Sequence, residues 1–125
     1  MLFESMRVQN EILGSALNAS SLRNDIILNN IANNDVPGYK TKAVDFEASL
    51  TKAIDSYKKT GKLDLGGAVP TVRTVYENYN YRIDTNNVDL ELEMVNLYQN
   101  SIKYETMISC VQSNSKRLNL ALNGR

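Results

Sequence analysis

The side chains that most often carry out chemistry in proteins are nearly absent from this chain. It has 125 residues, no histidine and a single cysteine, Cys110. The commonest general base and a common metal ligand are therefore missing, and no disulfide can form within the chain. The carboxylates form no persuasive pairs or clusters. We predict no catalytic residue, no metal site and no bound cofactor.

Cys110 lies in the middle of a predicted helix, next to Val111. A reactive thiol needs a lowered pKa, which a cationic neighbour or a helix N-terminus provides. Neither is expected at this position. We therefore interpret Cys110 as a small packing residue rather than a redox centre or nucleophile.

Two further groups could contact phosphate or nucleic-acid bases: Lys58, Lys59 and Lys62, and Tyr76, Tyr79 and Tyr81. The 14 basic residues are balanced by 14 acidic ones, so the chain has no broad positive charge that would favour nucleic acid. We interpret the lysines as a solvated helix end and the tyrosines as a packing surface. No nucleic-acid partner is predicted.

The start of the chain does not predict a cleavable signal peptide. Glu4 and Arg7 interrupt the first seven residues, and no small-residue cleavage site follows. No apolar run is long enough to predict a membrane span. Tryptophan is absent and much of the apolar content lies near the two ends, so a large central core is not expected.

The elements that must position these residues are two long helices at the two ends of the chain. Apolar and small residues recur at steps of three and four from about residue 5 to residue 31 or 33, and again from 89 to 122. This spacing keeps one stripe of each helix facing a partner helix. The last stripe runs through Leu90, Met94, Leu97, Ser101, Tyr104, Ile108, Val111, Ser115, Leu118 and Leu122.

The sequence therefore predicts a mainly α fold, in which the two terminal helices form an antiparallel coiled coil. Residues 1–33 and 89–125 would form this coiled-coil domain, and residues 34–88 a connecting region that is not an independent domain. The residues expected at the helix seam are Leu13, Leu17, Ile27 and Ile31 in the first helix, and Leu90, Leu97, Ile108, Val111, Leu118 and Leu122 in the last. Asn10 and Asn24 could form hydrogen bonds across it.

The connecting region predicts a short helix and extended segments. The helix would place Phe46, Leu50, Ala53, Ile54 and Tyr57 on one face, with Asp45 as its N-cap and Gly61 at its end. Residues 69–83 are rich in Val, Thr and Tyr, which predicts one or two short β segments, as an irregular hairpin.

Local signals also define where the long helices end and begin. Asn33, Asn34 and Asp35 end the first helix, and Pro37-Gly38 fits the centre of a type II turn. Asp89 is a suitable N-cap for the last helix.

The most specific motif is Asn30-Ile31-Ala32-Asn33, followed after two residues by Val36-Pro37-Gly38-Tyr39. A helix end and a turn explain Asn33, Pro37 and Gly38 but leave the rest of the motif arbitrary. The segment resembles a signature of bacterial flagellar axial proteins, which include rod, hook and hook-associated proteins. In that signature Asn-Ile-Ala-Asn is followed after two residues by Thr-Pro-Gly-Tyr, so Val36 replaces the usual Thr.

A second block points to the same family. It contains Asn87-Val88-Asp89, then Glu93-Met94, and then Asn100, Ile102 and Tyr104. Axial proteins carry a similar Asn-Val-(Asp/Asn) followed by Glu-Met at their last helix. The Asn-x-Ile-x-Tyr pattern is most similar to short proximal rod proteins of the FlgB type. The FlgC type usually has an Ala- and Ser-rich stretch ending in Arg-Ala-Tyr here.

The resemblance implies a structural subunit of the flagellar basal-body rod, assembled helically to transmit motor torque, with no enzymatic activity. It implies a position in the periplasm at the rod base, reached through the flagellar type III export apparatus without a cleavable signal peptide. The partners implied are copies of the chain, other rod proteins, the membrane-ring protein and the adaptor between ring and rod.

Three alternatives remain open at this point. The chain could be the FlgC type of rod protein. It could be a helical-hairpin adaptor or chaperone that captures a partner helix. An enzyme using carboxylates or Tyr104 is a third alternative, but no constellation of residues supports it.

Overall fold

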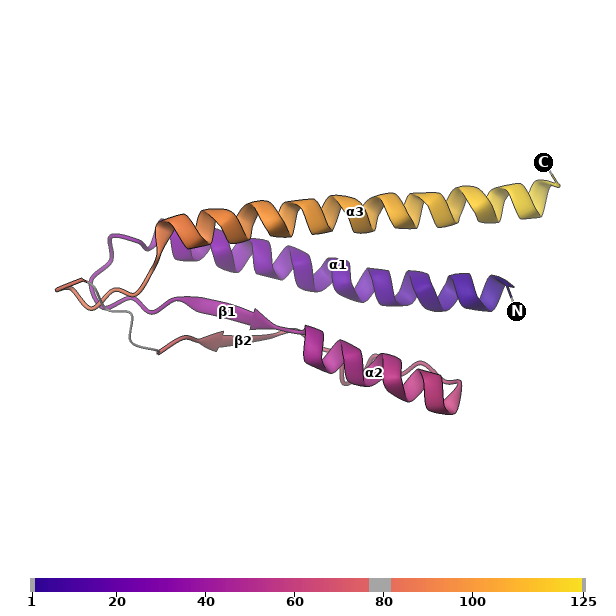
Figure 1. Cartoon of the computed structure of the whole chain (residues 1–125), viewed down its shortest axis with the longest axis horizontal. Helices are drawn as coiled ribbons and strands as arrows, with labels where there is room; N and C mark the ends of the chain where they lie inside the picture. Colours follow the sequence, from indigo (N-terminus) through magenta and orange to yellow (C-terminus); the bar gives the residue numbers. More distant parts are fainter. Residues whose placement is uncertain (1, 77–81, 125) are drawn as a thin grey trace.

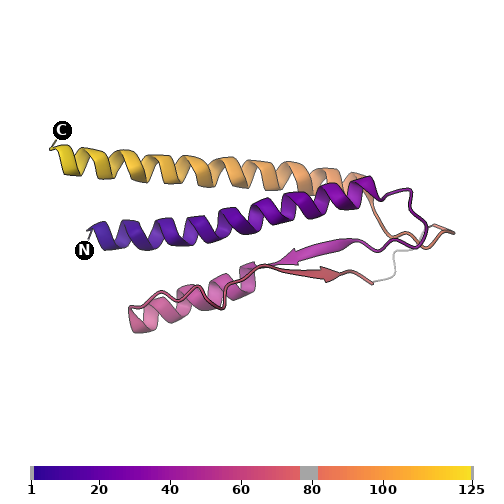
Figure 2. The ribbon, with the colours of Figure 1, turned by 180° about the vertical axis from the view of Figure 1, so that it is seen from behind.

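Two long helices run side by side and antiparallel along most of the molecule (Figure 1). The computed structural model describes residues 2–76 and 82–124, with the element order α1 (Leu2–Ala32), β1 (Lys42–Asp45), α2 (Glu47–Thr60), β2 (Thr71–Thr74) and α3 (Leu90–Asn123). Both chain ends lie at the same end of the helix pair, as the reverse view shows (Figure 2). The predicted mainly α fold with paired terminal helices is confirmed.

The start of α3 follows the predicted local chemistry. Asp89 is the N-cap, and its side chain accepts a hydrogen bond from the Leu92 backbone N–H at 3.1 Å. Gly124 ends the helix in the left-handed conformation. With 34 residues, α3 is roughly 50 Å long at ~1.5 Å per residue. It therefore extends along the whole of α1.

The seam between α1 and α3 is more polar than the apolar pattern predicts. The buried side chains of α3 are Glu93, Asn100 and Asn114. Each has a polar partner on α1: Asn30 for Glu93, Ser20 for Asn100, and Asn10 for Asn114. Three polar contacts thus join the helices, and one of them uses Asn10 as predicted.

At three turns of α3 the seam lies one residue before the predicted stripe. From Leu97 it continues to Asn100 rather than to Ser101, which is exposed. Met94 and Ser115 are exposed for the same reason. At these three turns apolar periodicity favoured the wrong position because the buried polar residues of α3 have hydrogen-bonding partners on α1, which removes most of the cost of burying them.

The residues predicted for the seam divide into two groups. Those that are buried or half-buried are Leu13, Leu17, Ile27, Ile31, Leu97, Ile108, Val111 and Leu118. Leu90 and Leu122 are 42% and 68% exposed, so they are not part of the seam within one chain. Their contact with a neighbouring subunit stays a prediction.

A small apolar core lies between α1 and α2. It consists of Ala19, Phe46 and Ala68, with Leu50 and Ala53 packed against it. Gly61 ends α2 in the left-handed conformation, as predicted.

The predicted N-cap of α2 is wrong. Phe46 occupies that position without a side-chain hydrogen bond. The Asp45 carboxylate instead pairs with Arg73 at 2.8 Å, which draws it away from the helix.

The two strands pair with each other across the connecting region. β1 and β2 are antiparallel, with Lys42 opposite Thr74 and Asp45 opposite Thr71. The predicted hairpin within residues 69–83 is wrong for the described part, because the partner of β2 is β1, which the sequence did not predict. Tyr79 and Tyr81, which supported the hairpin, lie outside the described residues.

Two glycines provide a matched test of this backbone. Gly38 has φ +73°, and an added Cβ would have room, at 3.7 Å from Thr85 Oγ1. We therefore expect Gly38→Ala to lower the free energy of unfolding by about 1 kcal/mol, because alanine disfavours this backbone conformation. Gly14 lies within α1 and has nothing within 4 Å of an added Cβ. Gly14→Ala should therefore raise the free energy of unfolding by about 0.5–1 kcal/mol, because alanine favours the helix. Urea unfolding followed by circular dichroism checks both, and shifts of the same sign would contradict the prediction.

Candidate functional site

The two sequence blocks meet where α1 ends and α3 begins (Figure 1). We call this region the helix junction and define it by Asn30, Tyr39, Asn86, Asn87 and Glu93. Polar contacts there join α1, the turn after it, both strands and α3. The junction therefore fixes how the two long helices leave the connecting region.

Asn30 is at the centre of the helix junction and is only 1% exposed. Its Nδ2 donates to the Lys42 carbonyl at 2.8 Å and to Glu93 Oε2 at 3.2 Å. Its Oδ1 accepts from the Lys42 backbone N–H at 3.0 Å and from the Tyr39 hydroxyl at 2.8 Å. One side chain of α1 thus holds β1, the turn and α3 together.

Tyr39 links the turn to the last turns of α1. Its hydroxyl lies 3.1 Å from Asn29 Oδ1 and 2.8 Å from Asn30 Oδ1. Partial burial, and then the nearby negative charge of Glu93, raise the pKa of the Tyr39 phenol. The phenol therefore keeps its proton and can donate it to the asparagine oxygens.

The Pro37-Gly38 turn has the predicted geometry. Gly38 has a positive φ, and the Tyr39 N–H donates to the Val36 carbonyl at 3.3 Å. The Gly38 N–H also donates to the Asp84 carbonyl at 2.7 Å, which joins the turn to the segment before α3. Val36, which replaces the usual Thr, is 44% exposed.

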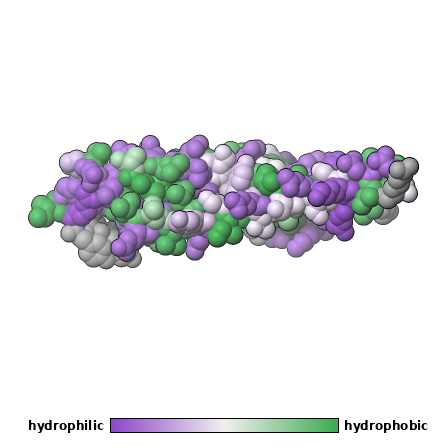
Figure 3. Space-filling view, turned by 90° about the horizontal axis from the view of Figure 1, so that it is seen from above, coloured by the Kyte–Doolittle hydropathy of each residue, from purple (hydrophilic) through white to green (hydrophobic). Residues whose placement is uncertain are grey.

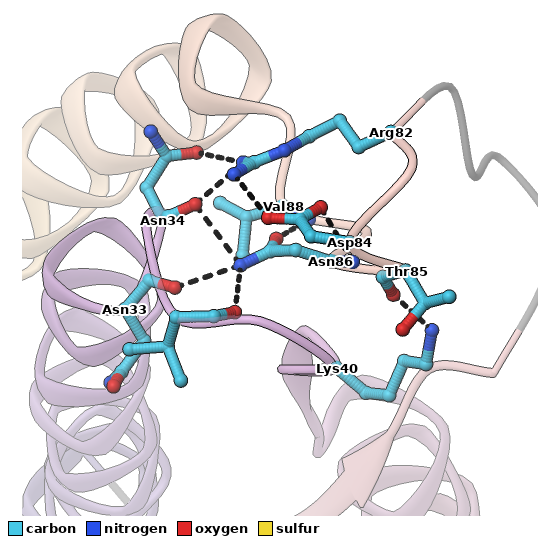
Figure 4. Close-up of polar contacts among 9 residues, drawn as sticks. Asn33, Asn34, Lys40, Arg82, Asp84, Thr85, Asn86 and Val88 are labelled. Atoms are coloured by element: carbon cyan, nitrogen blue, oxygen red, sulfur yellow. Dashed lines mark hydrogen bonds and ion pairs between the residues drawn. The ribbon is translucent and has the colours of Figure 1, made fainter.

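Asn86 binds the turn that follows α1 (Figure 4). Its Nδ2 lies 2.9 Å from the Asn33 carbonyl, 3.0 Å from the Asn34 carbonyl and 2.8 Å from the Val36 carbonyl. These carbonyls follow Ala32, the last residue of α1, so one buried amide holds the turn in a single shape against the segment before α3. Asn86 is 1% exposed.

Arg82 supports the same helix end (Figure 4). One guanidinium nitrogen donates to the Asn34 carbonyl at 2.5 Å, and the other pairs with Asp84 at 2.8 Å. Lys40 also crosses to this segment, where its Nζ donates to the Thr85 carbonyl. Sequence analysis missed Asn86 and Arg82, and the only available signal was that Asn86 directly precedes the second block.

Asn87 connects the start of α3 to both strands. Its Oδ1 accepts from the Thr41 N–H at 2.6 Å, and its Nδ2 donates to the Val75 carbonyl at 2.8 Å. Thr41 also directs its hydroxyl to Asn87 Oδ1 at 2.8 Å. Asn87 belongs to the predicted motif, whereas Thr41 was not predicted.

Glu93 is a buried carboxylate with no ion pair among the described residues. Burial raises the pKa of this carboxyl, the charge of Asp89 raises it further, and the hydrogen bond from Asn30 offsets part of the effect. Because 6% exposure leaves little contact with water, the ionised form is costly here.

The remaining motif residues lie in varied environments. Asn100 is 4% exposed and exchanges two hydrogen bonds of 2.9 Å with Ser20, through the hydroxyl and the carbonyl. Val88 is buried and Ile31 half-buried. The motif residues at the surface are Ala32, Pro37, Gly38, Asp89, Met94, Ile102 and Tyr104. The motif therefore combines junction residues with surface residues.

The described residues offer little for chemistry. They contain no group of three or more His, Cys, Asp or Glu side chains that could hold a metal ion. Cys110 is exposed, so its interpretation as a packing residue is wrong: the seam lies at Val111, one position further along. None of the helices in residues 2–76 and 82–124 could cross a membrane.

An open groove of about 1200 Å³ lies beside the helix junction, lined by parts of α1, β1 and α3. Its charged side chains have both signs, and two of them, Arg23 and Glu47, pair with each other at 2.7 Å. The lining therefore does not select one class of small ligand.

The family model for flagella basal body rod proteins matches residues 11–40, which cover most of α1 and the turn. This segment is therefore similar to the class of flagella basal body rod proteins.

Individual relatives extend the similarity over most of the chain. The flagellar basal body rod protein FlgB of Bacillus subtilis (strain 168) is 32% identical over 119 residues, covering 90% of this chain and 91% of the relative. The proteins of the same name from Yersinia enterocolitica and Borrelia hermsii are 33% and 32% identical, covering 82% and 85% of this chain and 81% and 89% of the relatives. The chain belongs to the flagellar basal body rod protein family, in its FlgB group.

Asn30 provides the first test of the helix junction. Asn30→Ala removes partners from the Lys42 backbone, Tyr39 and Glu93, so we expect a loss of about 2–3 kcal/mol in the free energy of unfolding. Asn18→Ala, at an exposed position of the same helix, should cost less than about 0.5 kcal/mol. Urea unfolding measures both. Equal losses would show that burial of the Asn30 amide does not matter.

Glu93 provides a pH-dependent test. Its pKa is raised in the folded state, so its contribution to stability is fully present below the unfolded-state pKa and is lost as the pH rises through the folded-state pKa. Glu93→Gln should therefore melt at a higher temperature than wild type at about pH 7, with a smaller gain toward about pH 4.

Glu105→Gln, at an exposed position of the same helix, is the matched control and should show no such trend. Melting curves followed by circular dichroism measure all three chains. A Glu93→Gln gain that is independent of pH would contradict the role of ionisation.

Proposed function

We propose that this chain is a structural subunit of the proximal rod of the flagellar basal body and acts through packing of its helices, not through catalysis. The observation that carries the proposal is the helix junction, where both family motifs fold together and fix α1 against α3. Family membership supports the structural role. No cofactor is part of the proposal.

The coiled-coil domain of residues 1–33 and 89–125 would form the contacts of the assembly. Residues 34–88 connect its helices. Heterologous contacts that do not close into a ring generate an open helical assembly. Long helices packed side by side in such a wall resist twisting, and this is how the rod would transmit torque from the motor.

The partners would be copies of the chain, other rod proteins, the membrane-ring protein and the adaptor at the rod base. The subunit would reach the periplasm through the flagellar export apparatus, without cleavage of a signal peptide. The marginal core supports this route, because a chain with only a small apolar cluster, centred on Ala19, Phe46 and Ala68, can be threaded unfolded through a channel.

A tagged chain expressed in a strain that lacks its own copy tests the proposal. Wild type should restore swimming and be recovered in purified basal bodies. Ile108→Asp should abolish both, because Ile108 is half-buried beside the seam and a charge there would not be paired. Gln112→Asp adds the same charge at an exposed position of α3 and should swim normally.

Two outcomes would contradict the proposal. One is normal swimming by the Ile108→Asp strain. The other is wild-type chain absent from basal bodies and present only in a soluble, stoichiometric complex, which is the result that an adaptor or chaperone predicts.

A further inference from the structure

The groove beside the helix junction is acidic where α3 begins. The carboxylates that line it there, and that form no ion pair in the described part of the chain, are those of Asp89, Glu91 and Glu93. Both arginines of the lining are paired, Arg23 with Glu47 at 2.7 Å and Arg82 with Asp84 at 2.8 Å. Their charges are therefore not available to this end of the groove.

Two lysines also line the groove, but neither pairs with these carboxylates. Lys103 follows Glu93 by ten residues on the same helix, a distance of roughly 15 Å along α3. Lys42 lies in β1 and forms no ion pair among the described residues. The acidic end of the groove thus keeps a negative charge that these residues do not pair.

Glu93 directs one carboxylate oxygen into the groove. Its Oε2 accepts the hydrogen bond from Asn30 at 3.2 Å. Its Oε1 has no hydrogen-bonding partner among the described residues, yet it is not enclosed, because every enclosed side-chain oxygen and nitrogen in that part of the chain has a partner. Glu93 is 6% exposed and lines the groove, so Oε1 is the atom through which it faces the groove.

The seam does not need the negative charge of Glu93. A glutamine oxygen would accept the same hydrogen bond from Asn30 and would cost less to bury. The helix dipole favours carboxylates in the first turn of α3, which accounts for the exposed Asp89 and Glu91 but gives no reason to bury Glu93. A buried carboxylate is favourable when a cation compensates its charge, and here that cation would come from outside the chain.

The groove is larger than a single side chain and partly apolar. Its volume is about 1200 Å³, and its apolar lining includes Ile26, Val44, Val88 and the exposed Leu92. Seen from above, hydrophobic side chains gather among hydrophilic ones over the half of the molecule that holds the helix junction (Figure 3). A metal ion needs several ligands close together, and the described residues contain no such group. The groove therefore suits a polypeptide segment in which apolar side chains flank a basic one.

We propose that the groove receives a segment of a neighbouring protein, whose lysine or arginine side chain forms an ion pair with Glu93. The inference rests on the proposed function, because a rod subunit is packed against neighbours. A cation at Oε1 offsets the cost of burying the charge. Glu93 is thus costly in the free chain and favourable in the assembly.

Stability and assembly should therefore change in opposite directions. The free Glu93→Gln chain should melt at a higher temperature than wild type at about pH 7. In the assembly the same change leaves the partner's basic side chain buried without an opposite charge, which weakens binding. A role of Glu93 in the seam alone would not separate the two effects.

Competition within one cell measures assembly. Full-length wild type and Glu93→Gln, with different tags, are co-expressed in a strain that lacks its own copy. The ratio of variant to wild type should be at least about tenfold lower in purified basal bodies than in whole cells. Glu105→Gln, at an exposed position of α3 outside the groove lining, should keep its ratio within about twofold. An unchanged ratio for Glu93→Gln, or an equal fall for Glu105→Gln, would overturn the proposal.

Photo-cross-linking in intact cells tests the partner's chemistry. Gln99→p-benzoylphenylalanine places the reactive group at an exposed position of the groove lining. We expect a cross-link to a protein segment with a lysine or arginine within about four residues, or one helical turn. Glu93→Gln should lower the yield at least about tenfold. A segment without a basic residue, a yield that does not depend on Glu93, or no cross-link to protein would overturn the proposal.

A double-mutant cycle then tests the ion pair itself. Changing the basic residue of the cross-linked segment to glutamine should lower the yield as much as Glu93→Gln does. The two changes together should lower it no further, because each alone already removes the same interaction. Losses that simply add would overturn the pair and would also reveal an effect of Glu93→Gln on folding alone.

The result is separable from the rod function. Wild-type chain present in basal bodies, with assembly and cross-link unaffected by Glu93→Gln, would refute the ion pair and leave the rod function standing. A cross-link that depends on Glu93, with the chain absent from basal bodies, would refute the rod function and leave the ion pair standing.

Discussion

The fold depends most on the buried side-chain amide of Asn30. It satisfies the backbone of β1, accepts the Tyr39 hydroxyl and donates to Glu93 of α3. Buried polar groups are costly unless they are hydrogen-bonded, so this one residue commits four segments to a single arrangement. Asn86 has a similar role at the end of α1. It lies in the segment before α3 and donates to carbonyls of the turn that follows α1.

The seam between the long helices follows the same logic. An apolar seam would bind more strongly, but it would tolerate slippage, since one apolar rung resembles the next. Here the pairs formed by Glu93, Asn100 and Asn114 with α1 specify one register. The single chain is less stable than it would be with an apolar seam, but the geometry of its helix pair is defined. This suits a subunit whose faces must match those of its neighbours.

The sequence predicted the features that are decided locally. Capping by Asp89, the end of α2 at Gly61 and the Pro37-Gly38 turn follow from the conformational preferences of those residues. The family motif also identified Asn30 and Asn87 as important positions. These are cases in which a residue and its nearest neighbours in the chain carry the information.

Contacts between distant segments could not be predicted in this way. The seam register depends on hydrogen bonds whose partners lie about eighty or more residues apart in two of the three pairs. The role of Asn86 depends on carbonyls of the turn after α1, and β1 forms a strand only because β2 lies beside it. A polar residue looks unfavourable in an apolar stripe until its partner is known.

The antiparallel arrangement of α1 and α3, with both chain ends at the same end, has a mechanical consequence (Figure 2). A force that slides one helix along the other loads the three polar pairs in shear, so all must break at once. A force that prises the free ends apart loads them in sequence, beginning with Asn114 and Asn10. The helix pair therefore resists sliding along its axis but separates much more easily when it is pulled apart progressively from the termini.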